Sequence, residues 1–290
     1  MREKIKDRKS FFLVLLLVIA SGSANKISYG GGVLSVISVL FIIYIHLINK
    51  KRLLSNLLIP LIMVFLYFIG YIIKFGILDF GFFARFVPYV VLPYCVLLLV
   101  GKERFFQIYI NVMVFLAIVA FPFYIFQLLD PFGLFNFLKP IETFFSLGKF
   151  DGTSATITSS NYVNVVFYSL NTIYTDIFHR SSGFAFEPGF YSIFIFLAIF
   201  FNIVISRNLF NRSGVILIIA LITTFSTTGF TAFFIVLIYY FYKGSGSVNS
   251  KYLIPLLIPF LIIVFINTSF LSEKIISSFQ GLGQRDLTEI

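Results

Sequence analysis

Long apolar stretches recur along the whole chain, and short basic segments separate several of them. The stretches are apolar all round and lack the alternation of apolar and polar residues that marks the strands of a membrane β-barrel. Of the 290 residues, 59% are hydrophobic and 12% are charged, against about 25% charged residues in soluble domains. A single soluble core cannot bury this much apolar surface, whereas a bilayer can solvate it. The sequence therefore predicts an all-α, polytopic integral membrane protein in which residues 1–290 form a single membrane domain.

Nine stretches are candidates for membrane spans, because about 20 apolar residues cross a bilayer. The first, seventh and eighth fall short of this length. The nine expected spans are residues 11–25, 31–48, 53–73, 85–100, 105–129, 188–206, 213–226, 228–242 and 252–271.

The positions of lysine and arginine predict the orientation of these spans. With the N-terminus in the cytoplasm, most of the 22 basic residues fall on the inner side in short segments, as the positive-inside rule requires. Residues 130–187 then form a large outer loop between spans five and six, and residues 272–290 begin a second outer loop. These orienting charges explain the net charge of +10, and we expect no nucleic-acid partner.

Both ends of the chain carry a further expectation. The basic N-terminus, the apolar Phe11–Ala20 and the small residues Ser21–Ala24 also fit a secretory signal peptide. We favour an uncleaved first span, because further spans follow directly. The chain stops at Ile290, soon after the ninth span, and we expect the natural protein to continue beyond it.

The segment Arg180–Tyr191 joins the large outer loop to the sixth span and holds the first candidate site. Arg180 offers a planar set of donors that suits phosphate oxygens. Glu187 stands directly before Pro188, which fits the first turn of a helix, where the helix dipole favours negative charge. A cation for phosphate and a carboxylate that accepts a proton would thus lie at the membrane surface. The alternative is a capped helix beside an arginine that reaches to the lipid headgroups.

Four further features are candidates with weaker support from the residues alone. His179 is a second candidate base, although a lone loop histidine is more often a bystander. Arg85 begins the fourth span, where it either faces a cavity as a functional residue or anchors the outer interface. Arg285 lies on the outer side beside Asp286, with which it forms either part of a site or a solvated pair on a loop. The turn Ser226-Thr227-Thr228-Gly229 separates spans seven and eight, and its hydroxyls either satisfy backbone groups or bind a polar ligand. Histidine, cysteine and clustered carboxylates are too scarce to predict a metal site, and we expect no cofactor.

Three of these motifs together resemble the bacterial O-antigen and capsule polymerases, which share a superfamily with the O-antigen ligases. The resemblance rests on Arg180–Gly183, Phe186–Gly189 and Ser226–Gly229. It extends over the whole chain in hydropathy, and over residues 180–229 in motif. The family has about ten to twelve spans, so the chain would lack its last helices.

The resemblance implies an inverting, metal-independent glycosyltransferase of lipopolysaccharide biosynthesis, with several spans in the bacterial inner membrane. Its donor would be a glycan on undecaprenyl diphosphate, and its acceptor a repeat unit on the same lipid, at the periplasmic face. Arg180, Arg285 and Arg85 would bind the diphosphate, and Glu187, or else His179, would be the base. Membrane lipid and a chain-length regulator protein are the further partners implied.

Two other functions that act on lipid-linked glycans are alternatives at this point, beside a structural membrane subunit, for which the pair of Arg180 and Glu187 would be needless. An O-antigen ligase would use the same chemistry with the lipid A core as acceptor. A flippase or transporter of lipid-linked oligosaccharides would break no bond. The second is the more remote, because a transporter is expected to show internal repeats and interrupted helices, and we find neither in the sequence.

Overall fold

The computed structural model describes residues 2–22, 62, 65–70, 72–73, 92–145, 162–171 and 179–244. This part of the chain is mostly helical. Two of the expected spans, residues 31–48 and 252–271, lie outside the described residues, as do Arg85 and Arg285. The chain forms two compact units, Met1–Gly229 and Phe230–Ile290, and all the contacts reported below lie within the first.

Two helices in the described part are long and apolar enough to cross a membrane. They are α6 (Lys102–Leu129, 28 residues) and α8 (Pro188–Ser206, 19 residues). Only 39% of the most apolar stretch of each helix is buried within the protein. The remaining surface carries large apolar side chains such as Phe115 and Ile118 of α6 and Ile193 of α8. An apolar surface of this extent suits lipid better than water.

The helix boundaries follow the sequence closely after residue 187. Helix α8 begins at Pro188, where the missing N–H costs no hydrogen bond, and it ends before Arg207, which has the left-handed φ of 54° that often closes a helix. Helix α9 (Arg212–Thr223) begins after Asn211, whose side chain accepts a hydrogen bond from Gly214 N–H at 2.8 Å. Helix α10 spans Thr227–Gly244. The two short spans expected here are therefore helices close to the predicted limits.

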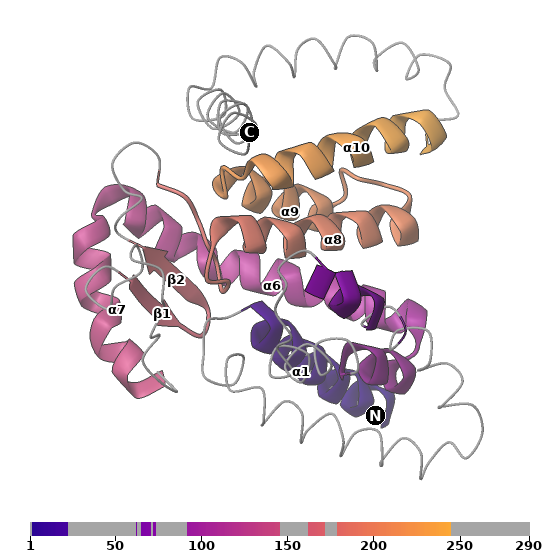
Figure 1. Cartoon of the computed structure of the whole chain (residues 1–290), viewed down its shortest axis with the longest axis horizontal. Helices are drawn as coiled ribbons and strands as arrows, with labels where there is room; N and C mark the ends of the chain where they lie inside the picture. Colours follow the sequence, from indigo (N-terminus) through magenta and orange to yellow (C-terminus); the bar gives the residue numbers. More distant parts are fainter. Residues whose placement is uncertain are drawn as a thin grey trace. The chain divides into compact units, whose positions relative to one another are not determined.

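Helix α6 is the centre of the first unit, since it contacts α1 (Arg2–Gly22), α8 and α9 (Figure 1). Aromatic rings form much of these contacts. Phe106 of α6 stacks on Phe201 of α8 at a centroid distance of 4.2 Å, and Phe11 of α1 meets Phe115 of α6 at 6.0 Å. The expected first span, residues 11–25, overlaps α1 over residues 11–22, and α1 begins earlier, at Arg2.

The segment that follows α6 contains regular structure of its own. Helix α7 (Pro131–Phe145) begins directly after α6, and strands β1 (Tyr162–Val165) and β2 (Tyr168–Asn171) form an antiparallel hairpin. In this register Tyr162 faces Asn171 and Val165 faces Tyr168. The hairpin corrects the expectation of an all-α chain. Valine and tyrosine favour strands, and the four-residue strands are too short to stand out among neighbouring apolar stretches.

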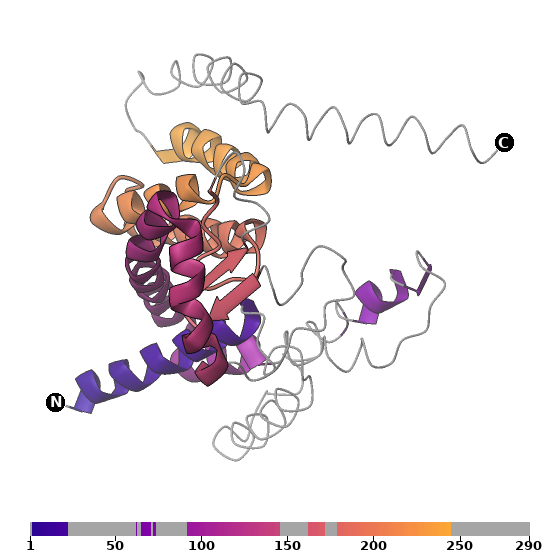
Figure 2. The same cartoon turned by 90° about the vertical axis from the view of Figure 1, so that its left-hand side faces the viewer.

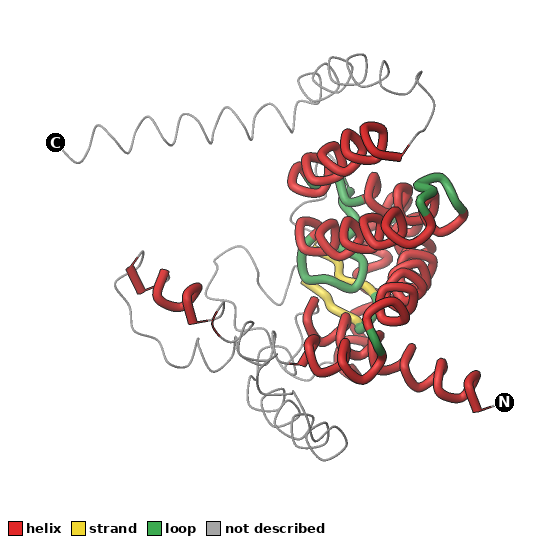
Figure 3. The backbone as a smooth tube through the Cα atoms, turned by 90° about the vertical axis from the view of Figure 1, so that its right-hand side faces the viewer, coloured by secondary structure: helices red, strands yellow, loops and turns green. Residues whose placement is uncertain are grey.

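A small hydrophobic core joins α7, the hairpin and the end of α6. Leu134 and Leu138 of α7 are 0% and 1% exposed and pack in one cluster with Val163, Tyr168 and other hairpin residues. Figure 1 and Figure 2 show the hairpin beside α7, and Figure 3 marks its two strands in yellow among the helices. The core holds the hairpin in place beside the segment that leads into α8.

Candidate functional site

Residues 179–187, here called the entry segment, lead from the hairpin into α8 without forming a helix or strand. Residues 181–185 are nevertheless buried. Three hydrogen bonds fix the segment to three elements, from Ser181 N–H to the Thr223 carbonyl (2.9 Å), from Ser169 N–H to the Gly183 carbonyl (2.7 Å) and from Gln127 Nε2 to the Arg180 carbonyl (3.4 Å). The entry segment is therefore held by α9, β2 and α6 together.

The side chain of Arg180 reaches the end of α9. Its Nε donates a hydrogen bond of 3.2 Å to the backbone carbonyl of Thr224, 44 positions later in the sequence. The guanidinium is half-buried. Carbonyl groups at a helix C-terminus carry partial negative charge, so this contact favours the cation.

Glu187 is the residue that precedes the first turn of α8. Its backbone is extended (φ −137°, ψ 148°), its side chain makes no capping bond, and the residue is exposed. Burial is the main reason that the pKa of Tyr162 is raised, and the charges of Glu142 and Glu187 raise it further. Glu187 is thus an accessible carboxylate at the start of α8.

His179 faces the interior through one ring nitrogen. Its Nδ1 is buried and has no hydrogen-bond partner among the described residues. Its backbone carbonyl accepts a hydrogen bond from the Tyr124 hydroxyl at 3.1 Å. A base must reach the proton it removes, and this orientation gives Nδ1 no path to an external substrate. Glu187 has the better access of the two candidate bases.

The turn Ser226–Gly229 packs against the first turns of α8. The hydroxyl of Ser226 shares a hydrogen bond of 3.0 Å with that of Ser192 and accepts a 3.3 Å bond from Gly229 N–H, so Ser226 caps α10. A Cβ at Gly229 would meet the Cβ of Ser192 at 2.6 Å, so only glycine allows this close approach. Ser226 is 2% exposed, whereas Thr228 is exposed. The turn therefore fixes α8, and Thr228 is its outward-facing hydroxyl.

Gly183 allows the entry segment to bend beneath Tyr191. Its φ is +51°, a left-handed conformation that most other residues avoid. A Cβ at this position would also lie 2.4 Å from the Tyr191 ring. Both observations explain why glycine occupies the fourth position of Arg180–Gly183.

A cavity of about 380 Å³ opens between α6 and α9, and the entry segment forms part of its wall. Its lining is mostly apolar, with Ser181 and Tyr191 among the few polar residues. The Tyr191 hydroxyl is buried and has no hydrogen-bond partner within the described part of the chain. The residues that line it are Ala117, Ile118, Ala120, Phe121, Pro122, Tyr124, Ser181, Tyr191, Ile216, Ile219, Ala220 and Thr223.

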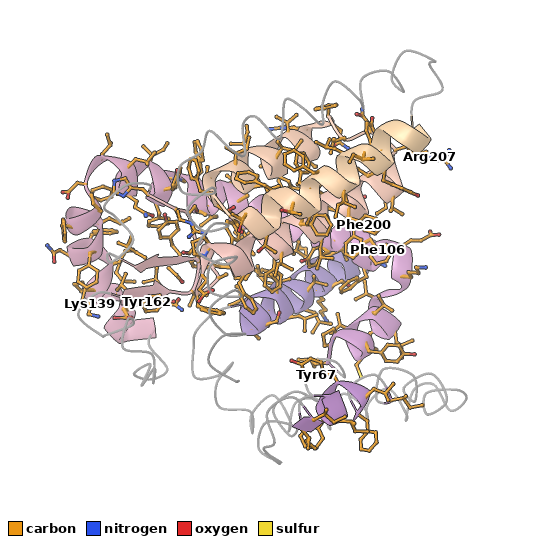
Figure 4. The ribbon with its side chains drawn as sticks, turned by 45° about the horizontal axis from the view of Figure 1, so that its top comes forward. Tyr67, Phe106, Lys139, Tyr162, Phe200 and Arg207 are labelled. Atoms are coloured by element: carbon orange, nitrogen blue, oxygen red, sulfur yellow. The ribbon has the colours of Figure 1, made fainter. Side chains whose placement is uncertain are left out.

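One group near the site was not identified from the sequence. Lys139 Nζ of α7 contacts Glu142 Oε2 at 2.8 Å and donates to the Tyr162 carbonyl at 3.3 Å, while Glu142 Oε1 accepts from Asn164 N–H at 3.1 Å. Figure 4 shows Lys139 beside Tyr162. The three-residue spacing of Lys139 and Glu142 on a helix was the available signal. These contacts of Lys139 and Glu142 hold α7 against the hairpin.

The predicted site residues fall into two sets. The first set lies in the first unit, where the entry segment contacts α9 and the turn contacts α8. This set comprises His179, Arg180, Glu187 and the turn Ser226–Gly229. Arg85 and Arg285 are outside the described residues. Within the described ranges, no three His, Cys, Asp or Glu side chains gather as metal ligands would.

No protein-family model matches the chain, and neither a curated protein nor a solved structure is significantly similar to it.

We predict that Gly183→Ala destabilises the protein by about 1–3 kcal/mol, since alanine would have to keep a strained backbone and displace the Tyr191 ring. Thermal unfolding of the purified protein in detergent measures the loss. Gly189→Ala is the matched control, because a Cβ at Gly189 meets nothing within 4 Å. Equal melting temperatures for the two variants would contradict the assignment of Gly183.

Proposed function

We propose that the chain is a multi-pass membrane glycosyltransferase that polymerises lipid-linked repeat units, as the O-antigen polymerases do. The observation that carries the proposal is the position of Arg180 beside the apolar cavity. Ser181 and Thr223 both line the cavity. Arg180 directly precedes Ser181, and its Nε donates a hydrogen bond to the carbonyl of Thr224, the residue that follows Thr223. A phosphate-binding cation next to an apolar cavity suits a lipid diphosphate.

The cavity is the observation that favours a substrate with a lipid chain. Its volume of about 380 Å³ lies at the low end of ligand cavities, which hold about 300–1,000 Å³. It can therefore enclose a section of a prenyl chain, with the rest of the chain in the bilayer. Several lining residues, among them Ile118 (54% exposed) and Ile219 (46% exposed), lie at the apolar surface, so the cavity is accessible from the side.

Arg180 and Glu187 support the chemical step. An acceptor hydroxyl attacks the anomeric carbon of the donor, the bond from that carbon to the diphosphate oxygen breaks, and the lipid diphosphate leaves. Arg180 stabilises the negative charge that develops on the diphosphate. Glu187 takes the proton of the acceptor hydroxyl, since it is exposed at the end of the same entry segment. Arg85 and Arg285 are candidates for further diphosphate contacts.

The proposal includes a topology. We place the N-terminus in the cytoplasm, nine spans in the bacterial inner membrane, and residues 130–187 at the periplasmic face. Lipid-linked oligosaccharide is the substrate, and a chain-length regulator is the expected protein partner. The ligase uses the same chemistry with another acceptor, so the phenotypes below separate the two.

We predict that Arg180→Gln abolishes polymer synthesis. Removing one donor to a developing anion lowers turnover about 10²–10³-fold, and Arg180→Lys should retain part of the activity because it keeps the charge. Lipopolysaccharide gels of a deletion strain expressing each variant give the measurement, and the expected product is core plus one repeat.

The control for Arg180 is Arg207→Gln. Arg207 is an exposed arginine at the other end of α8 (Figure 4), and its loss should leave the ladder unchanged. Bare core in the Arg180→Gln strain, with polymer retained on the lipid carrier, would indicate a ligase. Single repeats on the inner face would indicate a flippase, and a normal ladder would remove Arg180 from the reaction.

We predict that Glu187→Gln lowers turnover about 10²–10⁴-fold, the contribution of a positioned base, without a loss of protein. Glu187→Asp should recover part of the rate. The rate of polymer formation on purified lipid-linked repeat units measures both variants. His179→Gln serves as the comparison, and a larger loss in that variant would transfer the role of base to His179.

We predict that Ile219→Trp impairs polymer synthesis by filling the lipid cavity, and that it does so by raising KM for the lipid-linked substrate. Ile222→Trp is the matched control, since Ile222 lies on the same helix, is 50% exposed and does not line the cavity. Equal KM values for the two variants would show that the lipid chain binds elsewhere.

A further inference from the structure

Helix α7 has two unlike faces, and neither is the charged face expected of a helix on a soluble surface. Leu134 and Leu138 are buried against the hairpin. On the opposite face α7 contributes no charged side chain of its own, although the Asp130 carboxylate lies over Gly133 in the first turn. The large residues of this face are Phe132 and Phe137, which are 64% and 54% exposed. The residues of this face are Phe132, Gly133, Asn136, Phe137 and Pro140. A helix between a protein core and water would carry polar or charged residues there.

This outer face of α7 continues the apolar surface of α6. The Phe137 ring lies 6.5 Å from the ring of Phe126, in the last turn of α6, by centroid distance. Phe126 and Leu129 are themselves 39% and 80% exposed. The exposed apolar residues Phe126, Leu129, Phe132 and Phe137 therefore lie on the last turn of α6 and on the helix that follows it, and the Phe126–Phe137 contact joins the two helices.

The charged side chains of α7 are engaged with the hairpin. Lys139 and Glu142 bind each other and the hairpin backbone. Asp130, between α6 and α7, accepts a 2.8 Å hydrogen bond from Gly133 N–H and so begins the new helix at the point where α6 ends. A polar side chain at this junction fits the headgroup layer, where a chain leaves the hydrocarbon and turns.

We propose that α7 is an interfacial helix, with the face of Phe132 and Phe137 in the lipid of the leaflet that α6 enters at Leu129. The hairpin on its other side faces the aqueous phase. An amphipathic helix in this position buries its apolar face about 5–10 Å into the boundary of headgroups and acyl chains. The proposal requires α6 to be a span, and it is independent of glycosyl transfer.

The position of α7 determines the depth of the candidate site. The hairpin packs on α7, and Ser169 of the hairpin holds the Gly183 carbonyl of the entry segment at 2.7 Å. Arg180 and Glu187 belong to this segment. A helix anchored at headgroup level therefore places both residues at the depth of a phospholipid phosphate, which is also the depth of a lipid diphosphate.

Tryptophan fluorescence tests the proposal directly, because the chain contains no tryptophan. The Phe137→Trp variant, reconstituted into phosphatidylcholine vesicles, should show blue-shifted emission. Lipids brominated near the headgroup end of the acyl chain should quench it more strongly than lipids brominated near the bilayer centre. Phe132→Trp provides a second reporter on the same face, in case one substitution impairs folding.

Phe135→Trp is the matched control, since Phe135 lies on α7 but packs against the hairpin core. Its emission should be blue-shifted and insensitive to brominated lipid. Quenching of the outer-face reporters by aqueous iodide and not by brominated lipid would overturn the proposal. Protection from both quenchers would overturn it as well, and would assign the face of Phe132 and Phe137 to a protein partner.

Discussion

Backbone hydrogen bonding of the entry segment is the constraint on which the rest of the first unit depends. Residues 181–185 are buried and irregular, and buried backbone groups must find partners outside a helix or strand. The Ser181 N–H donates to the Thr223 carbonyl at the end of α9, and the Gly183 carbonyl accepts from the Ser169 N–H in the hairpin. With the bond from Arg180 to the Thr224 carbonyl, these bonds join the entry segment to the end of α9 and to the hairpin.

The sequence predicted the helices well where local signals mark their ends. Pro188 marks the start of α8, and the polar residues from Arg207 to Arg212 mark the turn into α9. The hairpin and α7 were not predicted, and residues 130–187 were expected to form a loop. In a chain this rich in phenylalanine and isoleucine, a four-residue strand is no more apolar than the sequence around it. The face of α7 that carries Leu134 can be identified as a core face only from the tertiary structure, because the hairpin covers it.

The candidate site was predictable in its residues and not in its contacts. Arg180 and Glu187 are seven positions apart, and the spacing alone suggested a common site. The bond from Arg180 to Thr224 and the packing of Tyr191 over Gly183 depend on tertiary structure, since they join a loop to two different helices. The cavity could not be predicted from the sequence either, because its walls come from α6 and α9, which are about 90 residues apart in the sequence.

The contact with Thr224 makes Arg180 a structural residue, and this role favours the proposed one. An unrestrained arginine would lose side-chain freedom on binding a diphosphate, at a cost of about 0.5–1.5 kcal/mol for an immobilised side chain. Arg180 has already lost part of that freedom, because its Nε is held at 3.2 Å by a carbonyl at the end of α9. A donor fixed before the substrate arrives stabilises developing charge better than one that must reorganise. In the proposed reaction, the hydrogen bond to Thr224 would thus also hold the cation ready for the leaving diphosphate.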